Sequence, residues 1–222
     1  MEGPNDRTFF DRFSYQVSFE DHNNIEKYLE WCNELPEFCS LFASTLTLVK
    51  TDIEGNLKKI REAKENEHCD SFDELFKSEK NNKRASLDSS GSTGSLWLYR
   101  AVEFVMEFLI SLLASKKFDG TNQAKETREI VNQAYERSLK RHHNFIVSNV
   151  FQQVTRLAPY KTNIIAMMKM KKIGVSNDEV YESIRKFLQS YIPLVQGLYE
   201  KLVEFQIETR RQTEFDLTCL DD

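Results

Sequence analysis

The sequence predicts an all-helical protein, and three observations support this prediction. Only 7 Gly and 4 Pro occur among the 222 residues, too few for the many tight turns of a fold built from short strands. Apolar residues recur every three or four positions over several long stretches, which is the spacing of an amphipathic helix. Hydrophobic residues make up 40% of the chain and charged residues 29%, as in folded globular domains. We expect a single domain over residues 1–222.

The first predicted helices lie between residues 24 and 65. Asn24 to Leu35 forms a short helix, whose inward stripe is Ile25, Tyr28, Leu29 and Cys32, with Trp31 beside it. Pro36 suits the first turn of a second helix, because the missing N–H leaves no hydrogen bond unmade there. From Glu37 to about Glu65 an apolar stripe continues through Phe38, Leu41, Phe42, Leu46, Val49, Ile53, Leu57 and Ile60. We expect one long amphipathic helix over this range.

Residues 61–95 are mostly polar. Phe72, Leu75 and Phe76 indicate one short helix within this segment. Its end, Lys80 to Ser95, is rich in Lys, Asn, Ser and Gly and has almost nothing to bury. We therefore expect a mobile polar loop at about 80–95.

The most apolar helix is predicted from Leu96 to Lys116. Its apolar residues cover more than half of the helix circumference, so it must lie at the centre of the core. A further stripe from Asn122 to Leu157 predicts one more long helix. Pro159 ends that helix, because the residue before a proline is displaced from helical backbone angles. A short helix follows through Met168.

The last third of the chain begins with a helix-start signal. Ser176 and Glu179 have the spacing of a capping box, in which each side chain bonds the backbone N–H of the other residue. We expect a helix from there to about Tyr191, another that Pro193 opens and that runs through Phe205, and a polar tail at about 209–222.

Charge and cysteine spacing exclude several classes of function. The formal net charge of −5 gives no global attraction to nucleic acid, whose binding depends on Lys and Arg. Cys32, Cys39, Cys69 and Cys219 lack the paired spacing of a structural zinc site, and we expect neither a metal nor a cofactor. Met1 to Phe10 has no apolar signal region, and Phe104 to Ala114 is too short to span a bilayer. We expect a cytoplasmic protein.

Three polar residues share one face of the helix predicted over residues 37–65. Asp52, Asn56 and Lys59 follow one another at i, i+4 and i+7, within about two helical turns. A carboxylate, an amide and an ammonium group together can hydrogen-bond neighbouring hydroxyls of a sugar. The same spacing is also typical of a solvated face with a weak Asp to Lys attraction, so spacing alone leaves both interpretations open.

Trp97 and the His142–His143 pair are further candidates. Trp97 at the start of the most apolar helix is either a core residue or a platform on which a sugar ring stacks. The two histidines lie in a basic stretch that also suits a solvated helix face. No nucleophile motif, glycine-rich phosphate loop or acid/base carboxylate pair is present. The sequence therefore does not predict an enzyme.

Three segments, in this order, resemble motifs of the glycolipid transfer protein family. Residues 49–60, VKTDIEGNLKKI, are similar to the family's Asp/Asn/Lys helix. Residues 96–100, LWLYR, resemble its Trp-bearing helix, and residues 139–147, LKRHHNFIV, its His segment. Phe151 and residues 158–161, APYK, follow in the same register. The resemblance covers about Asn24 to Glu208, and the acidic extension after Glu208 departs from the family pattern.

This resemblance implies a two-layer sandwich of about eight helices that encloses a pocket for lipid chains, and non-enzymatic transfer of glycosphingolipids between membranes. The implied headgroup residues are Asp52, Asn56, Lys59, Trp97 and His143. The implied chain-pocket residues are Val49, Phe104, Phe108, Leu139 and Phe151. The implied membrane contacts are Phe145, Tyr160 and Lys161.

The resemblance also implies individual roles. Asp52, Asn56 and Lys59 would bond the first sugar, on which Trp97 would stack, and His143 with Asp52 would hold the ceramide amide. A branch similar to ceramide-1-phosphate carriers has Lys at the position of Asn56 and Arg at that of Trp97, so the sugar-binding branch fits better. Ceramide-1-phosphate transfer and a lipid-sensing adaptor with the same fold remain alternatives. The expected partners are a glycosphingolipid and, transiently, a membrane surface to which the protein is peripheral; no nucleic acid is expected.

Overall fold

The computed structural model describes residues 7–42, 46–117, 123–144, 147–148, 151, 155–156, 159–170, 173–210 and 215–220. These residues form helices and connecting turns without a strand, which confirms the predicted fold class. The α-helices are α1 Ile25–Cys32, α2 Leu35–Ser40, α3 Thr47–Glu67, α4 Phe72–Asn81, α5 Gly91–Ala114, α6 Gln123–Arg137, α8 Lys161–Met168 and α9 Asn177–Glu204. Short 3-10 turns are η1 Phe9–Arg12, η2 Phe19–His22, η4 Ser115–Lys117, η5 Lys140–His142 and η6 Thr218–Leu220.

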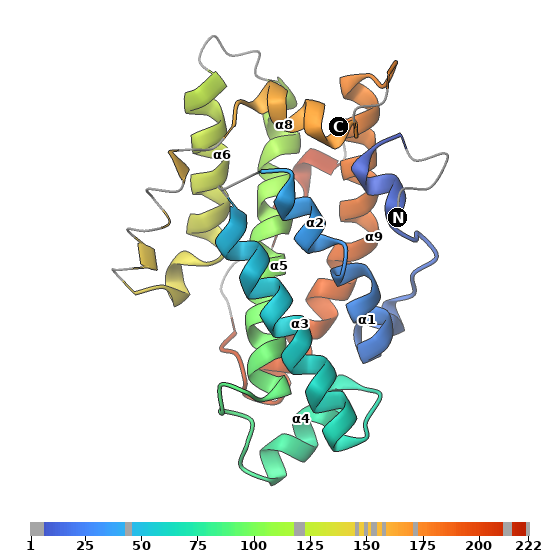
Figure 1. The fold of residues 1–222 in the computed structure, drawn as a ribbon, viewed down its shortest axis with the longest axis vertical. Coiled ribbons are helices and arrows are strands. Elements are labelled where there is room, and N and C mark those ends of the chain that lie inside the picture. The colour runs from blue at the N-terminus through green and yellow to red at the C-terminus, as the bar shows by residue number, and fades with distance from the viewer. Residues whose placement is uncertain are drawn as a thin grey trace.

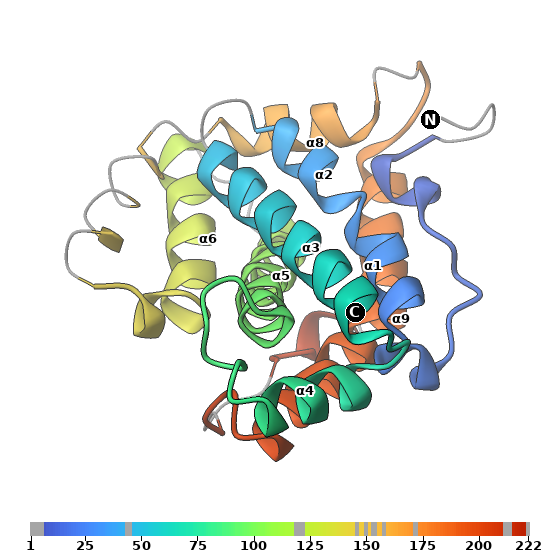
Figure 2. The ribbon, with the colours of Figure 1, turned by 60° about the horizontal axis from the view of Figure 1, so that its bottom comes forward.

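The helices form two layers. In Figure 1, α6, α5 and α9 lie side by side, and α1, α2 and α3 cross in front of them. Helix α8 covers one end of this sandwich, and α4 lies at the other end. Figure 2 looks along α5 and shows it between α3, α6 and α9, at the centre of the molecule. This is the predicted two-layer helical sandwich.

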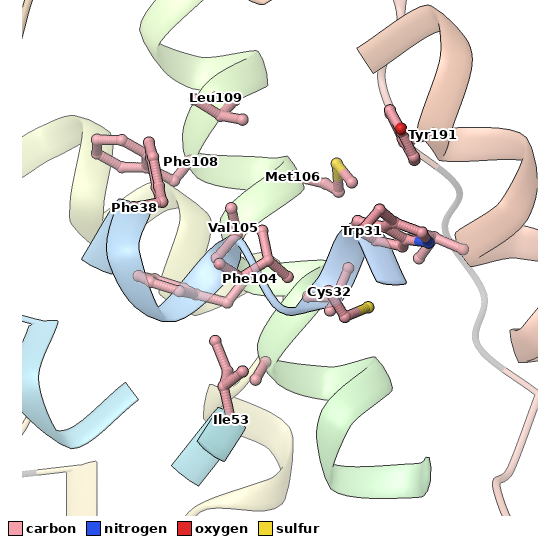
Figure 3. Close-up of a cluster of buried hydrophobic side chains, with 14 of the residues drawn as sticks. Trp31, Cys32, Phe38, Ile53, Phe104, Val105, Met106, Phe108, Leu109 and Tyr191 are labelled. Atoms are coloured by element: carbon pink, nitrogen blue, oxygen red, sulfur yellow. The ribbon is translucent and has the colours of Figure 1, made fainter. Parts of the chain in front are cut away.

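The core is built around α5, as the sequence predicts. Figure 3 shows its side chains meeting those of α1, α2, α3 and α9; the labelled members are Trp31, Cys32, Phe38, Ile53, Phe104, Val105, Met106, Phe108, Leu109 and Tyr191. All of them are buried. Aromatic pairs join the layers, with ring centroids of Trp31 and Tyr191 4.9 Å apart. Each fully buried large side chain contributes about 1.5–3 kcal/mol.

Two glycines let α3 and α5 approach closely. A Cβ at Gly91 would lie 2.6 Å from the Cβ of Ala63, and one at Gly94 would lie 3.0 Å from the Cβ of Lys59. Residue numbers rise along α5 as they fall along α3, so the helices run antiparallel. Gly91 therefore lies opposite Ala63 and Gly94 opposite Lys59. One helical turn further along α5, the same register brings Trp97 near the level of Asn56 on α3.

The helix predicted over residues 37–65 is in fact two helices. Helix α2 ends at Ser40 and α3 begins at Thr47. Between them the chain turns at Leu41–Phe42, and Phe42 packs edge-on against Phe108 with ring centroids 5.4 Å apart. The apolar stripe hides this break, because the residues on both sides of it face the same core.

The loop predicted at 80–95 is shorter than expected, because α5 begins at Gly91. The Oγ of Ser90 accepts the N–H of Thr93 at 3.0 Å. The buried carboxylate of Glu79 accepts the N–H groups of Gly91 and Ser92, each at 2.8 Å. The small residues that suggested a loop therefore form a capped helix end packed on α3.

Two further boundaries differ from the prediction. Residues 122–157 do not form one helix, since α6 ends at Arg137 and His143 is extended with ψ 135°. The Oδ1 of Asn144 accepts the N–H of Val147 at 3.0 Å and so begins a new turn. Pro193 was expected to open a separate helix, but it lies inside the continuous helix α9. Its neighbours Ile192 and Leu194 are both buried.

In the last third of the chain the predicted capping box is confirmed, and the described part of the C-terminal tail contacts the domain. The Ser176–Glu179 capping box is present, with its two bonds at 3.1 and 2.8 Å. The polar tail packs back onto the domain in its described part, residues 215–220. Phe215 is buried, and the guanidinium of Arg185 donates to the carbonyls of Cys219 and Leu220.

The close contact between α3 and α5 gives a stability prediction. Gly91→Ala should lower the free energy of unfolding by about 1–3 kcal/mol, because the added methyl overlaps Ala63. Gly55 on α3 is the matched control, since a Cβ there meets nothing within 4 Å. Gly55→Ala should raise the free energy of unfolding by about 0.5–1 kcal/mol. Urea denaturation measures both, and stabilisation by both substitutions would contradict the proposed contact.

Candidate functional site

The three polar residues of α3 lie on one face, as their spacing predicts. Asn56 is 3% exposed, and its Nδ2 makes no hydrogen bond of normal geometry with the described residues; its interaction with the Asp52 carboxylate is a weak one. Loss of water around Asp52 raises its pKa, while hydrogen bonding from the Asn56 amide and the charge of Lys59 lower it. The Nζ of Lys59 is 3.3 Å from the carboxylate of Asp88 in the α4–α5 loop. A buried unpaired amide costs about 1–3 kcal/mol, so this face suits an added hydrogen-bonding ligand.

Trp97 is half-buried on α5, level with Asn56. The guanidinium carbon of Arg100 lies 4.7 Å from the centre of its ring. Arg100 thus packs against one face of the indole. The Nε of Arg100 donates to the carboxylate of Glu208 at 2.9 Å, which joins the C-terminal segment to this part of α5.

His143 lies close enough to Arg100 for the guanidinium charge to act on its imidazole, and an aromatic network holds its ring. Its Nδ1 is 3.2 Å from the hydroxyl of Tyr135, which in turn donates to the Oγ of Ser148 at 2.9 Å. This contact leaves Nε2 for a ligand. Burial, followed by the positive charge of Arg100, lowers the pKa of His143, so the imidazole is neutral near pH 7.

The predicted chain-pocket residues lie in the apolar wall between α3, α5 and α6. Val49, Phe104, Phe108 and Leu139 are buried, and Phe151 is partly buried against them. Phe151 stacks on Tyr135 with centroids 4.0 Å apart and meets Phe104 edge-on at 5.6 Å. Tyr135 therefore links His143 to this apolar wall.

Comparison with known proteins identifies the family. Residues 23–170 match the family model described as "Glycolipid transfer protein (GLTP)". The chain belongs to the glycolipid transfer protein family. Proteins of this family transfer lipids and are not enzymes.

Several relatives and solved structures resemble the chain. A glycolipid transfer protein of Danio rerio is 29% identical over 189 residues, which cover 83% of this chain and 89% of that protein. One of Aureobasidium melanogenum is 28% identical over 177 residues, covering 79% and 81%. A structure that addresses how FAPP2 selects simple glycosphingolipids using the GLTP-fold superposes with a TM-score of 0.74 at 21% identity, covering 91% and 98%. Mouse ceramide-1-phosphate transfer protein superposes with a TM-score of 0.73 at 18% identity, with the same coverage.

The residues expected to contact membranes in this glycolipid transfer protein family member differ in exposure and in whether their charge is paired. Tyr160 is 53% exposed. The Nζ of Lys161, by contrast, donates to the carbonyl of Ser115 at 2.6 Å and to the carboxylate of Glu126 at 2.8 Å, so its charge is already paired. Phe145 lies outside the described residues. Among the described helices, none is long and apolar enough to cross a membrane.

The ion pairs around the site were not predicted from the sequence. Glu103 and Glu107 are buried in α5 and meet Arg141 and Arg137, at 3.4 and 3.5 Å. Their i, i+4 spacing inside the most apolar helix was the available signal, because buried carboxylates require partners. The contact of Glu208 with Arg100 spans 108 positions of sequence, and no local pattern indicates it. The described residues contain no group of three or more His, Cys, Asp or Glu side chains that could hold a metal.

His142 gives a pH prediction. Burial and the charge of Arg100 lower its pKa from 6.5 to about 4. The unfolded chain therefore takes up a proton near pH 6.5 that the folded protein does not take up until about pH 4, so the free energy of unfolding falls as the pH drops through this window. His142→Gln should lose less stability than wild type between about pH 7.5 and pH 5 in urea denaturation. Equal losses in both proteins would refute the shift.

Proposed function

We propose that this protein transfers glycosphingolipids between membranes and binds their headgroup at the α3–α5 face. The observation that supports this proposal is the buried Asn56 amide, whose Nδ2 makes no hydrogen bond of normal geometry with the described residues and which the α3–α5 register brings near the level of Trp97. Such an arrangement is costly in the free protein, and a ligand with hydroxyl groups would remove the cost. The proposed headgroup residues are Asp52, Asn56, Lys59, Trp97 and His143.

Each residue has a distinct task in this proposal. The Asp52 carboxylate accepts from sugar hydroxyls, the Asn56 amide both accepts and donates, and the Lys59 ammonium donates. The sugar ring stacks on the face of Trp97 opposite Arg100. The Nε2 of His143, together with Asp52, bonds the ceramide amide and so fixes the depth at which the lipid enters.

The charges around the site favour a sugar over a phosphate headgroup. Asn56 is uncharged, Asp52 repels anions, and the charge of Arg100 is compensated by Glu208 at 2.9 Å. The names of the sequence relatives point in the same direction. The fold alone does not decide, because ceramide-1-phosphate transfer protein shares it.

The hydrocarbon chains supply affinity but little selectivity. Taking both chains of a sphingolipid out of a bilayer costs about 0.8 kcal/mol per methylene, on the order of 20 kcal/mol or more in total. The apolar wall around Phe104 and Phe108 must return most of this energy for any lipid with similar chains. Selection therefore depends on polar groups that the wrong headgroup leaves unpaired.

Transfer of fluorescent galactosylceramide and ceramide-1-phosphate between vesicles tests the proposal. Wild type should prefer galactosylceramide. Asn56→Leu should lower galactosylceramide transfer by at least about tenfold, because the sugar loses its amide partner. Its melting temperature should be unchanged or higher, since a buried unpaired group is removed. Faster transfer of ceramide-1-phosphate by wild type would refute the sugar assignment and favour a phosphosphingolipid carrier.

The two tryptophans provide a separate test. Binding of galactosylceramide should change the fluorescence of half-buried Trp97, whereas Trp31 lies in the core. Trp97→Phe should therefore abolish the fluorescence response to galactosylceramide vesicles, and Trp31→Phe should retain it. A response that persists in Trp97→Phe would contradict the stacking role.

We also propose that the protein docks transiently on membranes through the α8 end. Tyr160 precedes α8 and Ile173 follows it, and both are exposed large hydrophobic residues. Tyr160→Ser with Ile173→Ser should weaken sedimentation with phosphatidylcholine vesicles severalfold. Leu87 is the matched control, being 50% exposed in the α4–α5 loop at the opposite end of the molecule (Figure 1). An equal loss for Leu87→Ser would refute this choice of face.

A further inference from the structure

The end of α9 turns the chain back toward α5. Gln206 has a left-handed backbone with φ 62°. The N–H groups of Ile207 and Glu208 both bond the carbonyl of Leu202, at 2.8 and 3.1 Å. This reversal closes the helix end and holds the following residue against the sandwich.

Glu208 is consequently fixed in a buried network. One carboxylate oxygen accepts from the Nε of Arg100 at 2.9 Å and lies 3.8 Å from the Nε2 of His142. The other accepts from the N–H and hydroxyl of Thr209, at 2.8 and 3.3 Å. The side chains of Arg100 and Glu208 are 12% and 4% exposed. Burial raises the pKa of Glu208, but the bonds from Arg100 and Thr209 outweigh this and keep it below its usual value.

Arg100 lies inside the proposed headgroup site. It stacks on Trp97, and its charge lowers the pKa of both His142 and His143. A guanidinium at this position is well suited to phosphate or sulfate, because it offers paired N–H donors and a permanent charge. Glu208 accepts from the Nε of this guanidinium and neutralises its charge.

We propose that Glu208 is a specificity-determining residue. By neutralising Arg100 beside Trp97, it removes the attraction of the site for anionic headgroups and so favours uncharged sugars. This inference rests on the proposed function, in which the α3–α5 face receives the headgroup. Other described cations nearby also have partners, Arg141 with Glu103 and Lys59 with Asp88. Removing the Glu208 charge would expose the guanidinium that contacts the sugar platform.

Galactosylceramide and its 3-sulfated form, sulfatide, are the probes for this role, because they differ by one sulfate. In vesicle transfer assays, Glu208→Gln should raise the sulfatide to galactosylceramide ratio about tenfold over wild type, and added salt should reduce this gain. Glu204→Gln is the matched control. It removes the same charge from the end of α9, where Glu204 is exposed, and should leave the ratio unchanged.

A folded Glu208→Gln protein with the wild-type ratio would overturn the inference. If that variant does not fold, because a buried guanidinium is left unpaired, Arg100→Gln should be compared with the double variant Arg100→Gln, Glu208→Gln. In that background no guanidinium is left to expose, so the two sulfatide ratios should agree. A rise of about tenfold from the first to the second would show that Glu208 acts without Arg100, and would overturn the inference. Failure of wild type to transfer galactosylceramide would refute the proposed function instead, while the change in sulfatide transfer caused by Glu208→Gln would still test Glu208.

Discussion

The close antiparallel contact of α3 with α5 is the constraint on which the rest of the molecule depends. Glycine at positions 91 and 94 brings the two backbones together, with only 2.6 Å between a Cβ placed at Gly91 and the Cβ of Ala63. The contact sets the register between the helices, and the register places Trp97 level with Asn56. It also leaves the opposite side of α5 facing α6 and α9 (Figure 2). One packing contact therefore positions both the polar face and the apolar wall.

Ion pairs between α5 and more distant parts of the chain fix the second side of the site. Glu103 and Glu107 of α5 meet Arg141 and Arg137, while Arg100 meets Glu208. A buried carboxylate is costly without a partner, so these contacts restrict where the segment after α6 and the end of α9 lie. Helix α5 therefore fixes two other segments beside the proposed headgroup site, the one that follows α6 and the one that follows α9. Because the charges of Arg137, Arg141 and Arg100 are neutralised in these ion pairs, the site has little attraction for an anionic headgroup.

The sequence predicted the parts of this architecture that depend on periodicity and local chemistry. The all-helical class, the central helix near residues 96–116 and the capping box at Ser176 all follow from local patterns and are confirmed. The break between α2 and α3 could not be seen, because Phe38 before it and Phe42 within it both pack on Phe108 of α5 and so continue one apolar stripe. The start of α5 was missed for a related reason. Gly and Ser are typical of loops, and here the buried Glu79 carboxylate and the proximity of α3 require them at a helix end. The grouping of Asp52, Asn56 and Lys59 was predicted by spacing, whereas Glu208 depends on a tertiary contact.

In the lipid-free protein, the polar face of α3 lowers the stability of the fold. The buried Nδ2 of Asn56 interacts only weakly with the Asp52 carboxylate, and loss of water raises the pKa of that carboxylate. A core leucine at position 56 would serve stability better, since replacing an unsatisfied polar group by an apolar one removes a desolvation cost. The cost is recovered when hydroxyl groups complete the network, so it contributes selectivity more than affinity. A carrier needs this division, because it must distinguish headgroups and yet release the lipid at the acceptor membrane. Apolar burial holds any sphingolipid, and the unsatisfied polar face favours the lipid that completes it.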